Sequence, residues 1–284
     1  MVGIVVLNYV NYAETIRCVD SLLKQKGVQL EIVIVDNGSD NESMAILDEK
    51  YNLSSVKLIS LKENIGFAKG MNAGIDVLRS NGINNIFICN SDLVFTTERI
   101  MHQIVTSDQY TDKRVAVINP LVLNVNGSKA NRTYFKEKFL RARMLKTFFP
   151  IIEKIKTAYF KGKANTISSV DSDGIVKQRY SNKTVIHDKE YLVVGCGYLL
   201  TERFFQHYNG LFPKTFLYYE EYALILFLNA CGLKTSFVET DVIEHKHGAS
   251  TVKNKKNNFN KNSKKIILKL IATSPSAIIR KYGK

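Results

Sequence analysis

Side chains that could bind a cation and a phosphate group follow an apolar stretch near residue 90. Asn90-Ser91-Asp92 comes directly after the apolar run Ile86–Cys89, and apolar residues resume at Leu93. A carboxylate at the end of an apolar strand is costly unless it meets a cation or strong hydrogen-bond donors. We therefore interpret Asp92 as an anchor for a divalent metal and a diphosphate. A β-turn stabilised by Asx hydrogen bonds is the alternative interpretation.

Asp36 has a similar position, because it directly follows the apolar run Ile32–Val35. Helix capping or turn formation accounts for Ser39 or Asp40, but it accounts less easily for a carboxylate placed directly after an apolar run. Ligands of open α/β sheets bind at the carboxyl ends of the strands. We therefore expect Asp36 and Asp92 to lie at the same edge of one sheet.

Two later segments contain candidates for a general base and for a second metal ligand. Glu220 and Glu221 open a stretch typical of a helix, where acidic residues are favoured by the helix dipole; the functional interpretation is a general base. His245 and His247 point the same way if their segment is extended. A neutral imidazole can bind a divalent metal, although a lone histidine is more often structural.

The elements that must position these residues alternate in the α/β manner. The apolar patterns predict strands at 3–7, 31–35, 56–59, 86–89 and 234–238, and helices at 11–26, 43–51, 69–80 and from 220. Short connections and right-handed crossovers predict a parallel sheet. The inward helix faces are expected to contain Ile16, Val19, Leu22, Leu23, Met71, Ile75, Leu78, Leu224, Phe227 and Leu228.

Length and motif content argue against several classes of protein. A chain of 284 residues with 45% hydrophobic content fits one large α/β domain. Asn8-Tyr9-Val10-Asn11 stands where a dinucleotide-binding domain has GxGxxG, and a P-loop motif is missing from the sequence. The cysteines form no CxxC pair, so neither a zinc site nor a disulfide framework is expected. The first strand begins directly after Met1, and no apolar run approaches the ~18 residues of a membrane span, so we expect neither a signal peptide nor a membrane helix.

The net charge of +14 indicates an anionic partner. Basic and apolar residues interleave between Lys129 and Lys163, and residues 253–284 contain ten Lys or Arg and no acidic residue. Both segments favour amphipathic helices on an anionic membrane surface. A helix packed on the domain is the alternative for the first segment and disorder the alternative for the second. Nucleic acid is a weaker rival, because no RNP-type motif, zinc finger or basic zipper is present in the sequence.

Six segments, taken in order, resemble the family 2 glycosyltransferases, the inverting group with a GT-A fold, and especially their rhamnosyltransferase-like members. The segments are Val5-Val6-Leu7-Asn8-Tyr9, Val33–Asp40, Glu63–Gly74, Asn90-Ser91-Asp92, Tyr218–Glu221 and His245–Ser250. The resemblance implies an α/β GT-A fold with a Rossmann-like, mostly parallel sheet flanked by helices. The glycosyltransferase domain would span residues 1–250, with a nucleotide-sugar half at 1–123, a basic insertion at 124–190, an acceptor half at 191–250 and a basic tail at 251–284.

The resemblance also implies a role for each matching residue. The nucleotide sugar would be bound by Asn8, Asp36, Asn64, Gly66, Lys69, Asn90, Ser91 and Asp92. Mg²⁺ or Mn²⁺ would be held by Asp92 and His245, the catalytic base would be Glu221 or Glu220, and the acceptor side would include Gly195 and Tyr219. The sequence departs from the family at Asn90, Glu221 and Ala223, where aspartate is usual.

Together these features predict a hexosyltransferase that moves rhamnose or another hexose from a nucleotide-diphosphate sugar to a lipid-linked glycan. Capsule, O-antigen or exopolysaccharide assembly would use such a reaction. The protein would be cytoplasmic and peripheral on the inner face of the plasma membrane, and nucleic acid would not be a partner. Formation of a homodimer is left open. One alternative is a non-catalytic nucleotide-sugar-binding partner subunit, suggested by Glu221 and Ala223. Another is a nucleotidyltransferase, which would usually carry a Gly-rich loop after the first strand.

Overall fold

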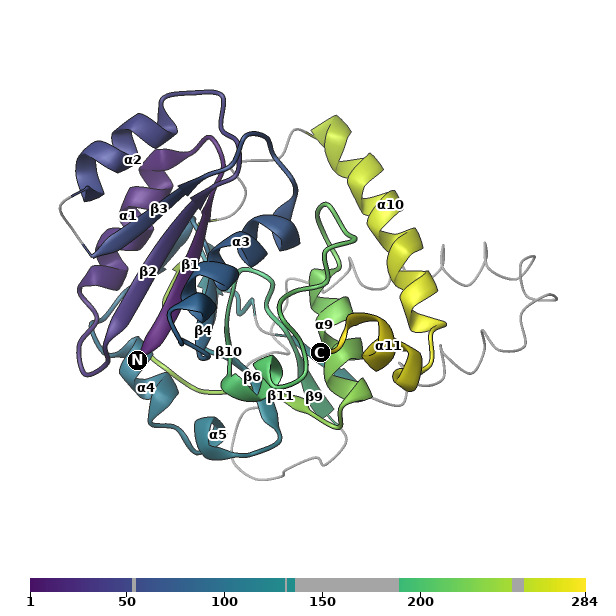
Figure 1. The fold of residues 1–284 in the computed structure, drawn as a ribbon. Helices are drawn as coiled ribbons and strands as arrows, with labels where there is room; N and C mark the ends of the chain where they lie inside the picture. The colour runs from purple at the N-terminus through teal and green to yellow at the C-terminus, as the bar shows by residue number, and fades with distance from the viewer. Residues whose placement is uncertain (53–54, 131, 136–188, 247–252) are drawn as a thin grey trace. The chain divides into compact units, whose positions relative to one another are not determined.

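The computed structural model describes residues 1–52, 55–130, 132–135, 189–246 and 253–284 (Figure 1). The amphipathic helices predicted between Lys129 and Lys163 fall largely outside the described residues, as does His247. The chain divides into two compact units, one formed by Met1–Thr133 with Glu190–Lys284 and the other by Tyr134–Lys189. The site described below belongs to the first unit.

The strands of the described residues are β1 (Val2–Asn8), β2 (Leu30–Asp36), β3 (Val56–Ser60), β4 (Ile86–Asn90), β5 (Leu93–Phe95), β6 (Val115–Asn119), β7 (Val122–Asn124), β8 (Arg132–Phe135), β9 (Lys189–Leu192), β10 (Gly197–Leu200), β11 (Lys234–Phe237) and β12 (Ile243–His245). The helices are α1 (Tyr12–Leu23), α2 (Ser43–Tyr51), α3 (Phe67–Ser80), α4 (Ile100–Val105), α5 (Asp108–Thr111), α8 (Glu202–Phe205), α9 (Glu220–Ala230), α10 (Lys253–Ile271) and α11 (Pro275–Tyr282).

Seven strands of the described residues form a central sheet in the order β11-β6-β10-β4-β1-β2-β3. The strands β3, β2, β1 and β4 pair in parallel, which confirms the sheet predicted for the first half of the chain. Strand β10 is antiparallel to both β4 and β6, and β11 is parallel to β6. The register pairs Asn8 with Asp36 and Leu7 with Asn90, so the polar residues that end these strands meet at one edge.

Helix α3 packs closely on β1 because small residues face the sheet. A Cβ atom at Gly74 would lie 2.5 Å from Cγ1 of Val5, and one at Gly70 would lie 2.7 Å from Cδ1 of Leu7. The sequence predicts this helix from residue 69, but it begins at Phe67. The close approach sets the N-terminus of α3 beside the edge where the strands β1 and β2 end.

The predicted inward faces are confirmed for α3 and α9, but one residue of α1 is wrong. Leu23 has an exposed fraction of 45%, whereas Cys18, Val19 and Leu22 are fully buried. With 3.6 residues per turn, the residue directly after Leu22 points about 100° away from the buried face. The buried face of α1 therefore includes Cys18, which the sequence analysis left out, and excludes Leu23.

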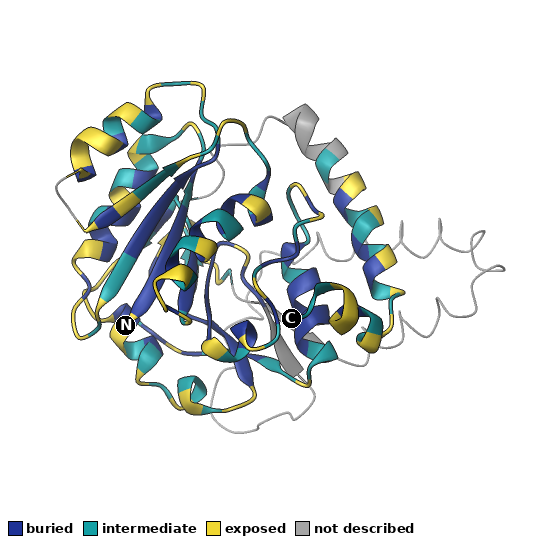
Figure 2. Ribbon diagram, viewed as in Figure 1, coloured by how far each residue is buried: buried dark blue, intermediate teal, exposed yellow. Residues whose placement is uncertain are grey.

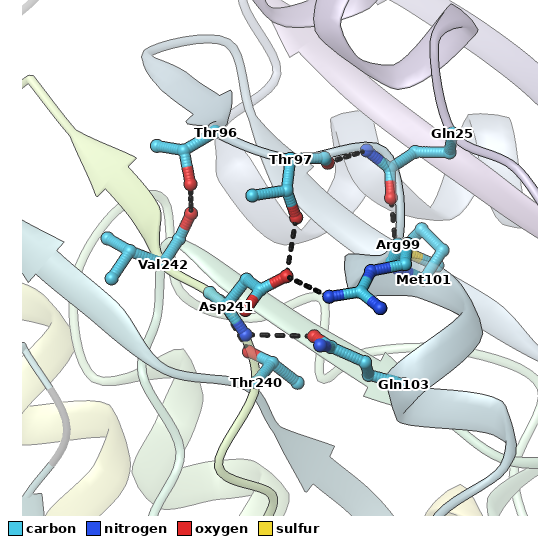
Figure 3. A network of polar contacts seen from close by, with 9 residues as sticks. All are labelled: Gln25, Thr96, Thr97, Arg99, Met101, Gln103, Thr240, Asp241 and Val242. Carbon is cyan, nitrogen blue, oxygen red and sulfur yellow. Dashed lines mark hydrogen bonds and ion pairs between the residues drawn. The ribbon is translucent and has the colours of Figure 1, made fainter.

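A second sheet of the described residues has the order β5-β12-β7 and carries His245. A network of polar contacts fixes the segment that enters β12 (Figure 3). The Thr96 hydroxyl donates to the carbonyl of Val242 at 2.6 Å, and the Thr97 hydroxyl donates to Oδ2 of Asp241 at 2.7 Å. Residues directly after β5 therefore set the position of the strand that ends at His245.

The C-terminal residues form the helices α10 and α11, which both contact α9 (Figure 1). Buried and exposed side chains alternate along α10 (Figure 2). The residues facing inward from the two helices include Ile267, Leu270 and Ile278, and an exposed row on α10 consists of Lys261, Lys265 and Lys269. This part of the chain is therefore helical and amphipathic rather than disordered. Across the described ranges, every helix is too short or too polar to cross a membrane.

Candidate functional site

At the carboxyl ends of β1 and β2, two buried polar side chains bond to each other. Nδ2 of Asn8 donates to Oδ1 of Asp36 at 2.5 Å, and Oδ1 of Asn8 accepts from the Thr15 hydroxyl at 2.6 Å. The carboxylate of Asp36 also accepts from the backbone N–H of Ser39 at 3.0 Å and from its hydroxyl at 2.6 Å. These bonds hold the carboxylate in one orientation, because buried polar atoms keep their partners. Sequence analysis gave Thr15 no role and interpreted Ser39 as a turn or capping residue, without its bonds to Asp36.

The loop before α3 is tied to the same edge by Asn37, another residue to which the sequence analysis gave no role. Nδ2 of Asn37 donates to Oδ1 of Asn64 at 3.1 Å, and Oδ1 of Asn37 accepts from the N–H of Ile65 at 3.1 Å. Oδ1 of Asn64 also accepts from the N–H of Gly66 at 3.0 Å. Asn64 and Gly66 therefore lie beside the Asp36 turn, while Lys69 is exposed in the first turns of α3.

Asp92 and His245 meet although they come from distant parts of the chain. Nε2 of His245 lies 3.4 Å from Oδ2 of Asp92, and Nδ1 of the same ring lies 3.4 Å from Oδ1 of Asn124. The N–H of Lys246 donates to the carbonyl of Asp92 at 3.0 Å, which extends the pairing of β12 with β5. The Asp92 turn and the end of β12 therefore form one structural unit.

The donor atoms at this point fit Mg²⁺ or Mn²⁺. Asp92 offers a carboxylate oxygen and His245 an imidazole nitrogen, and Oδ1 of Asn90 is buried without a hydrogen-bond partner among the described residues. The described part of the chain contains no cluster of three or more His, Cys, Asp and Glu side chains for a metal. A cation held by so few protein ligands keeps open positions for water or phosphate oxygens, as Mg²⁺ commonly does.

The carboxylate of Glu221 lies beside the exposed backbone of Gly195. A Cβ atom at Gly195 would lie 4.0 Å from Oε2 of Glu221. The carbonyl of the next residue, Cys196, accepts a hydrogen bond from the N–H of Asn90 at 2.8 Å. Burial raises the pKa of the Cys196 thiol, and the nearby charge of Asp92 is a second cause of the same shift. The segment that contains Gly195 and Cys196 therefore connects Glu221 with the Asp92 turn.

Glu220 differs sharply from its neighbour Glu221. Glu220 is 9% exposed, and its Oε1 atom has no hydrogen-bond partner among the described residues. The pKa of Glu220 is raised to about 7, chiefly by burial and also by the charge of Glu221, while hydrogen bonds to the backbone of the same turn and to Thr215 oppose the shift. Burial, with charge from both glutamates, also raises the pKa of the Tyr198 hydroxyl. Sequence analysis left the choice between the two glutamates open and gave Tyr198 no part.

The backbone that leads into α9 is held in an unusual conformation. Tyr218 has φ 72° and Tyr219 has φ 71°, which is the left-handed region. Tyr219 is the N-cap residue of α9, directly before Glu220, and its ring lies 5.5 Å from that of Tyr222. Such backbone conformations cost on the order of 1–3 kcal/mol each and persist where the surroundings hold them, commonly at functional sites.

A mostly parallel α/β sheet with carboxylates at its carboxyl edge is the arrangement that the GT-A resemblance implies. Residues 2–168 match the family model described as "Glycosyl transferase family 2". The chain therefore belongs to glycosyl transferase family 2, and the family predicted from the sequence is confirmed. The rhamnosyltransferase-like subgroup stays a prediction.

Relatives with assigned names match less than half of the chain. A chondroitin synthase from Pasteurella multocida (strain Pm70) is 27% identical over 139 residues, which cover 48% of this chain and 14% of that protein. The succinoglycan biosynthesis protein ExoO from Rhizobium meliloti (strain 1021) is 33% identical over 118 residues, which cover 41% of this chain and 32% of that protein. The match thus spans less than a third of either relative.

Solved structures match almost the whole chain at low sequence identity. The mannosyltransferase PcManGT from Pyrobaculum calidifontis, in complex with GDP-Man and Mn²⁺, has a TM-score of 0.54 at 10% identity and covers 99% of this chain and 70% of its own. S. aureus TarS 1-349, in complex with UDP, has a TM-score of 0.52 at 12% identity, and the match covers 95% of this chain and 64% of the TarS chain. These likenesses confirm the predicted fold class.

Proposed function

We propose that this chain is an inverting glycosyltransferase that moves a hexose from a nucleotide-diphosphate sugar to an acceptor hydroxyl. Family membership supports the transferase class, and relatives named for chondroitin and succinoglycan synthesis support a polysaccharide as the product. Within this proposal, residues 1–123 bind the donor and residues 191–250 supply the base and the acceptor side. The acceptor is a lipid-linked glycan, and rhamnose is one candidate sugar.

The observation that carries this proposal is the connection between Glu221 and Asp92. The Gly195–Cys196 segment joins them, because Gly195 lies beside the Glu221 carboxylate and Cys196 bonds to the backbone of Asn90. A general base and a cation-binding carboxylate joined through one short segment are what a transfer between a donor and an acceptor needs. Gly195 has no side chain, so an acceptor hydroxyl can approach the Glu221 carboxylate past its backbone.

In the proposed reaction, the chain's own residues bind the donor and remove one proton. Asp36, oriented by Asn8, accepts hydrogen bonds from the edge of the nucleobase. Asp92 and His245 would hold Mg²⁺ or Mn²⁺, which neutralises charge on the departing diphosphate. The Glu221 carboxylate accepts the proton of the acceptor hydroxyl while the hydroxyl oxygen attacks the anomeric carbon.

The new glycosidic bond forms on the face opposite the breaking bond to the diphosphate, so the configuration inverts. The anomeric carbon carries positive charge as the leaving group departs, and nearby carboxylates stabilise it. Glu220 is buried and holds its proton up to about pH 7. We therefore assign the base role to Glu221, the more exposed of the two glutamates.

A membrane location belongs to the same proposal. The exposed lysines of α10 recur at every fourth position, which places them on one face of the helix. Residues 253–284 contain no acidic residue. Such a face is suited to the anionic inner surface of the plasma membrane, where a lipid-linked acceptor is found. The protein would then be cytoplasmic and peripheral.

A turnover screen tests the proposal directly. Purified protein with Mn²⁺ is given each common nucleotide sugar and a membrane extract, and the release of nucleoside diphosphate is measured. We expect release with one donor, and we expect Asp92→Ala to abolish it. Failure of every donor to bind would contradict the transferase assignment.

A non-catalytic partner subunit of the same fold is the second candidate. Ala223, where the family usually has aspartate, is fully buried among apolar residues of α9, and the glutamate at 221 is one methylene longer than the usual base. Donor binding without release would favour this candidate. It also predicts that Glu221→Gln leaves the cellular glycan unchanged.

A further inference from the structure

Residues 215–219, here called the leader segment, connect the donor side of the site with α9. The carbonyl of Phe216 accepts a hydrogen bond from the N–H of Phe67 at 2.8 Å. A Cβ atom at Gly66 would lie 2.5 Å from the same carbonyl oxygen. The leader segment thus packs directly on the loop that carries Asn64 and Gly66, and four residues after Phe216 the chain enters α9 at Glu220.

Helix α10 contacts the leader segment from another direction. The hydroxyl of Ser263 donates to the carbonyl of Leu217 at 2.6 Å, and Ser263 is 1% exposed. The rings of Phe216 and Phe259 stack with their centroids 4.6 Å apart and their planes at 20°. Phe216 itself is 36% exposed, so the Phe259 ring supplies packing for a residue that lies near the surface.

These contacts directly precede two residues whose backbone conformation is intrinsically unfavourable. Tyr218 and Tyr219 are both left-handed and directly precede the two glutamates. Residues with side chains leave this region unless the surrounding structure holds them. The bond from Ser263 ends on Leu217, the residue immediately before this pair, so α10 holds the leader segment at the start of the left-handed turn.

We propose that Phe259 and Ser263 of α10 are positioning residues for the transfer reaction. They hold the leader segment so that the Glu221 carboxylate faces Gly195, although neither residue touches the reacting atoms. The proposal rests on the assignment of Glu221 as the general base. Both residues lie outside residues 2–168, the part of the chain that the family model matches.

Two variants remove the contacts between α10 and the leader segment, and two control variants retain them. Ser263→Ala removes the hydroxyl, and alanine favours helix more than serine does, so α10 itself is not weakened. Phe259→Leu removes the stacked ring, whereas Phe259→Tyr retains it. Asn262→Ala is the matched control for Ser263→Ala, because Asn262 is an exposed neighbour on the same helix.

We expect Ser263→Ala and Phe259→Leu to lower kcat roughly tenfold or more, because a base displaced by about 1 Å loses much of its rate advantage. The dissociation constant for the nucleoside diphosphate with Mn²⁺ should stay within about twofold, since the Asn37–Asn64 bonds hold the donor loop independently. Asn262→Ala and Phe259→Tyr should retain the wild-type kcat.

The experiment combines transfer kinetics with hydrogen exchange of residues 215–222 in the substrate-free protein. Faster exchange together with a lower kcat in the two contact-removing variants is the expected result. Unchanged exchange, or faster exchange with an unchanged kcat, would overturn the inference while leaving the proposed function intact. If the wild-type protein transfers no sugar, the proposed function fails first, and the inference fails with it.

Discussion

His245 and Asp92 form a close pair, with Nε2 of the imidazole 3.4 Å from Oδ2 of the carboxylate. The pair exists because β12 lies beside β5, which begins directly after Asp92. The exposed fractions of the two side chains are 12% and 17%. Both side chains are therefore largely shielded from solvent but keep some exposed surface.

Replacing His245 should weaken metal binding. We expect His245→Ala to raise the dissociation constant for Mn²⁺, measured calorimetrically with a nucleoside diphosphate present, by more than about tenfold. His102→Ala is the control, because its exposed ring contacts the carbonyl of Gly27 at 3.2 Å, away from Asp92. Equal affinities for His245→Ala and the wild type would remove His245 from the metal site.

The two glutamates at the start of α9 should respond differently to the same substitution. Glu221→Gln should lower kcat for transfer by at least about a hundredfold, because the amide cannot accept the acceptor's proton. Glu220→Gln should lower kcat by less than about tenfold, because Glu220 is buried and already protonated below pH 7. The reverse order of effects would assign the base to Glu220.

Glu220 should also make the folded protein less stable as the pH rises. Its folded pKa of about 7 lies above the ordinary value of 4.5, so between these values the unfolded chain loses a proton that the folded protein keeps. The free energy of unfolding therefore falls across this window, by on the order of 3 kcal/mol for this group. This contribution is fully present below pH 4.5 and is lost by about pH 7.

Urea unfolding at pH 5 and pH 8 measures this contribution through Glu220→Gln. Glutamine does not titrate, so the stability of the variant relative to wild type should increase between the two pH values. Glu239→Gln changes an exposed carboxylate and serves as the control. A constant difference between Glu220→Gln and wild type would show that the Glu220 carboxyl is not held protonated.

Gly66 should tolerate a side chain far less well than Gly82. Both residues are left-handed, with φ 89° and φ 80°, but a Cβ at Gly66 would lie 2.5 Å from the Phe216 carbonyl oxygen, whereas a Cβ at Gly82 meets no atom within 4 Å. Gly82→Ala should cost about 1–2 kcal/mol for its backbone conformation alone. Gly66→Ala should lower the thermal midpoint further and weaken donor binding. Similar thermal midpoints for the two variants would mean that the leader segment moves aside without destabilising the folded protein.

Charge reversal on α10 should release the protein from anionic vesicles. The double change Lys265→Glu and Lys269→Glu should weaken vesicle binding at low salt by at least about tenfold, since each basic residue near such a surface contributes about 1 kcal/mol. The double change Lys24→Glu and Lys113→Glu alters the net charge equally at exposed positions elsewhere. Equal losses in sedimentation with vesicles would indicate a general charge effect and contradict a binding face on α10.

Much of the fold could be predicted because the signals are local. The run Ile86–Cys89 forms most of β4, and the predicted face of α3 is buried, since continuous apolar runs and helical periodicity depend on neighbouring residues. Leu23 shows the limit of such patterns: it is apolar and adjacent to the buried Leu22, yet it lies at the exposed end of α1. Apolar character alone does not say which of two adjacent residues faces the sheet.

The sequence by itself determined the strands β1 to β4 and β11, the helices α1 to α3 and α9, and the acidic residues at the ends of the β2 and β4 runs. Tertiary structure decided which of these residues meet. His245 reaches Asp92 through a strand pairing between segments far apart in the chain. Glu220 differs from Glu221 because packing buries one carboxyl and leaves the other beside Gly195. Ser263 reaches the leader segment because α10 packs beside α9. Burial and long-range pairing depend on where the whole chain comes together, so no local pattern of residue types contains them.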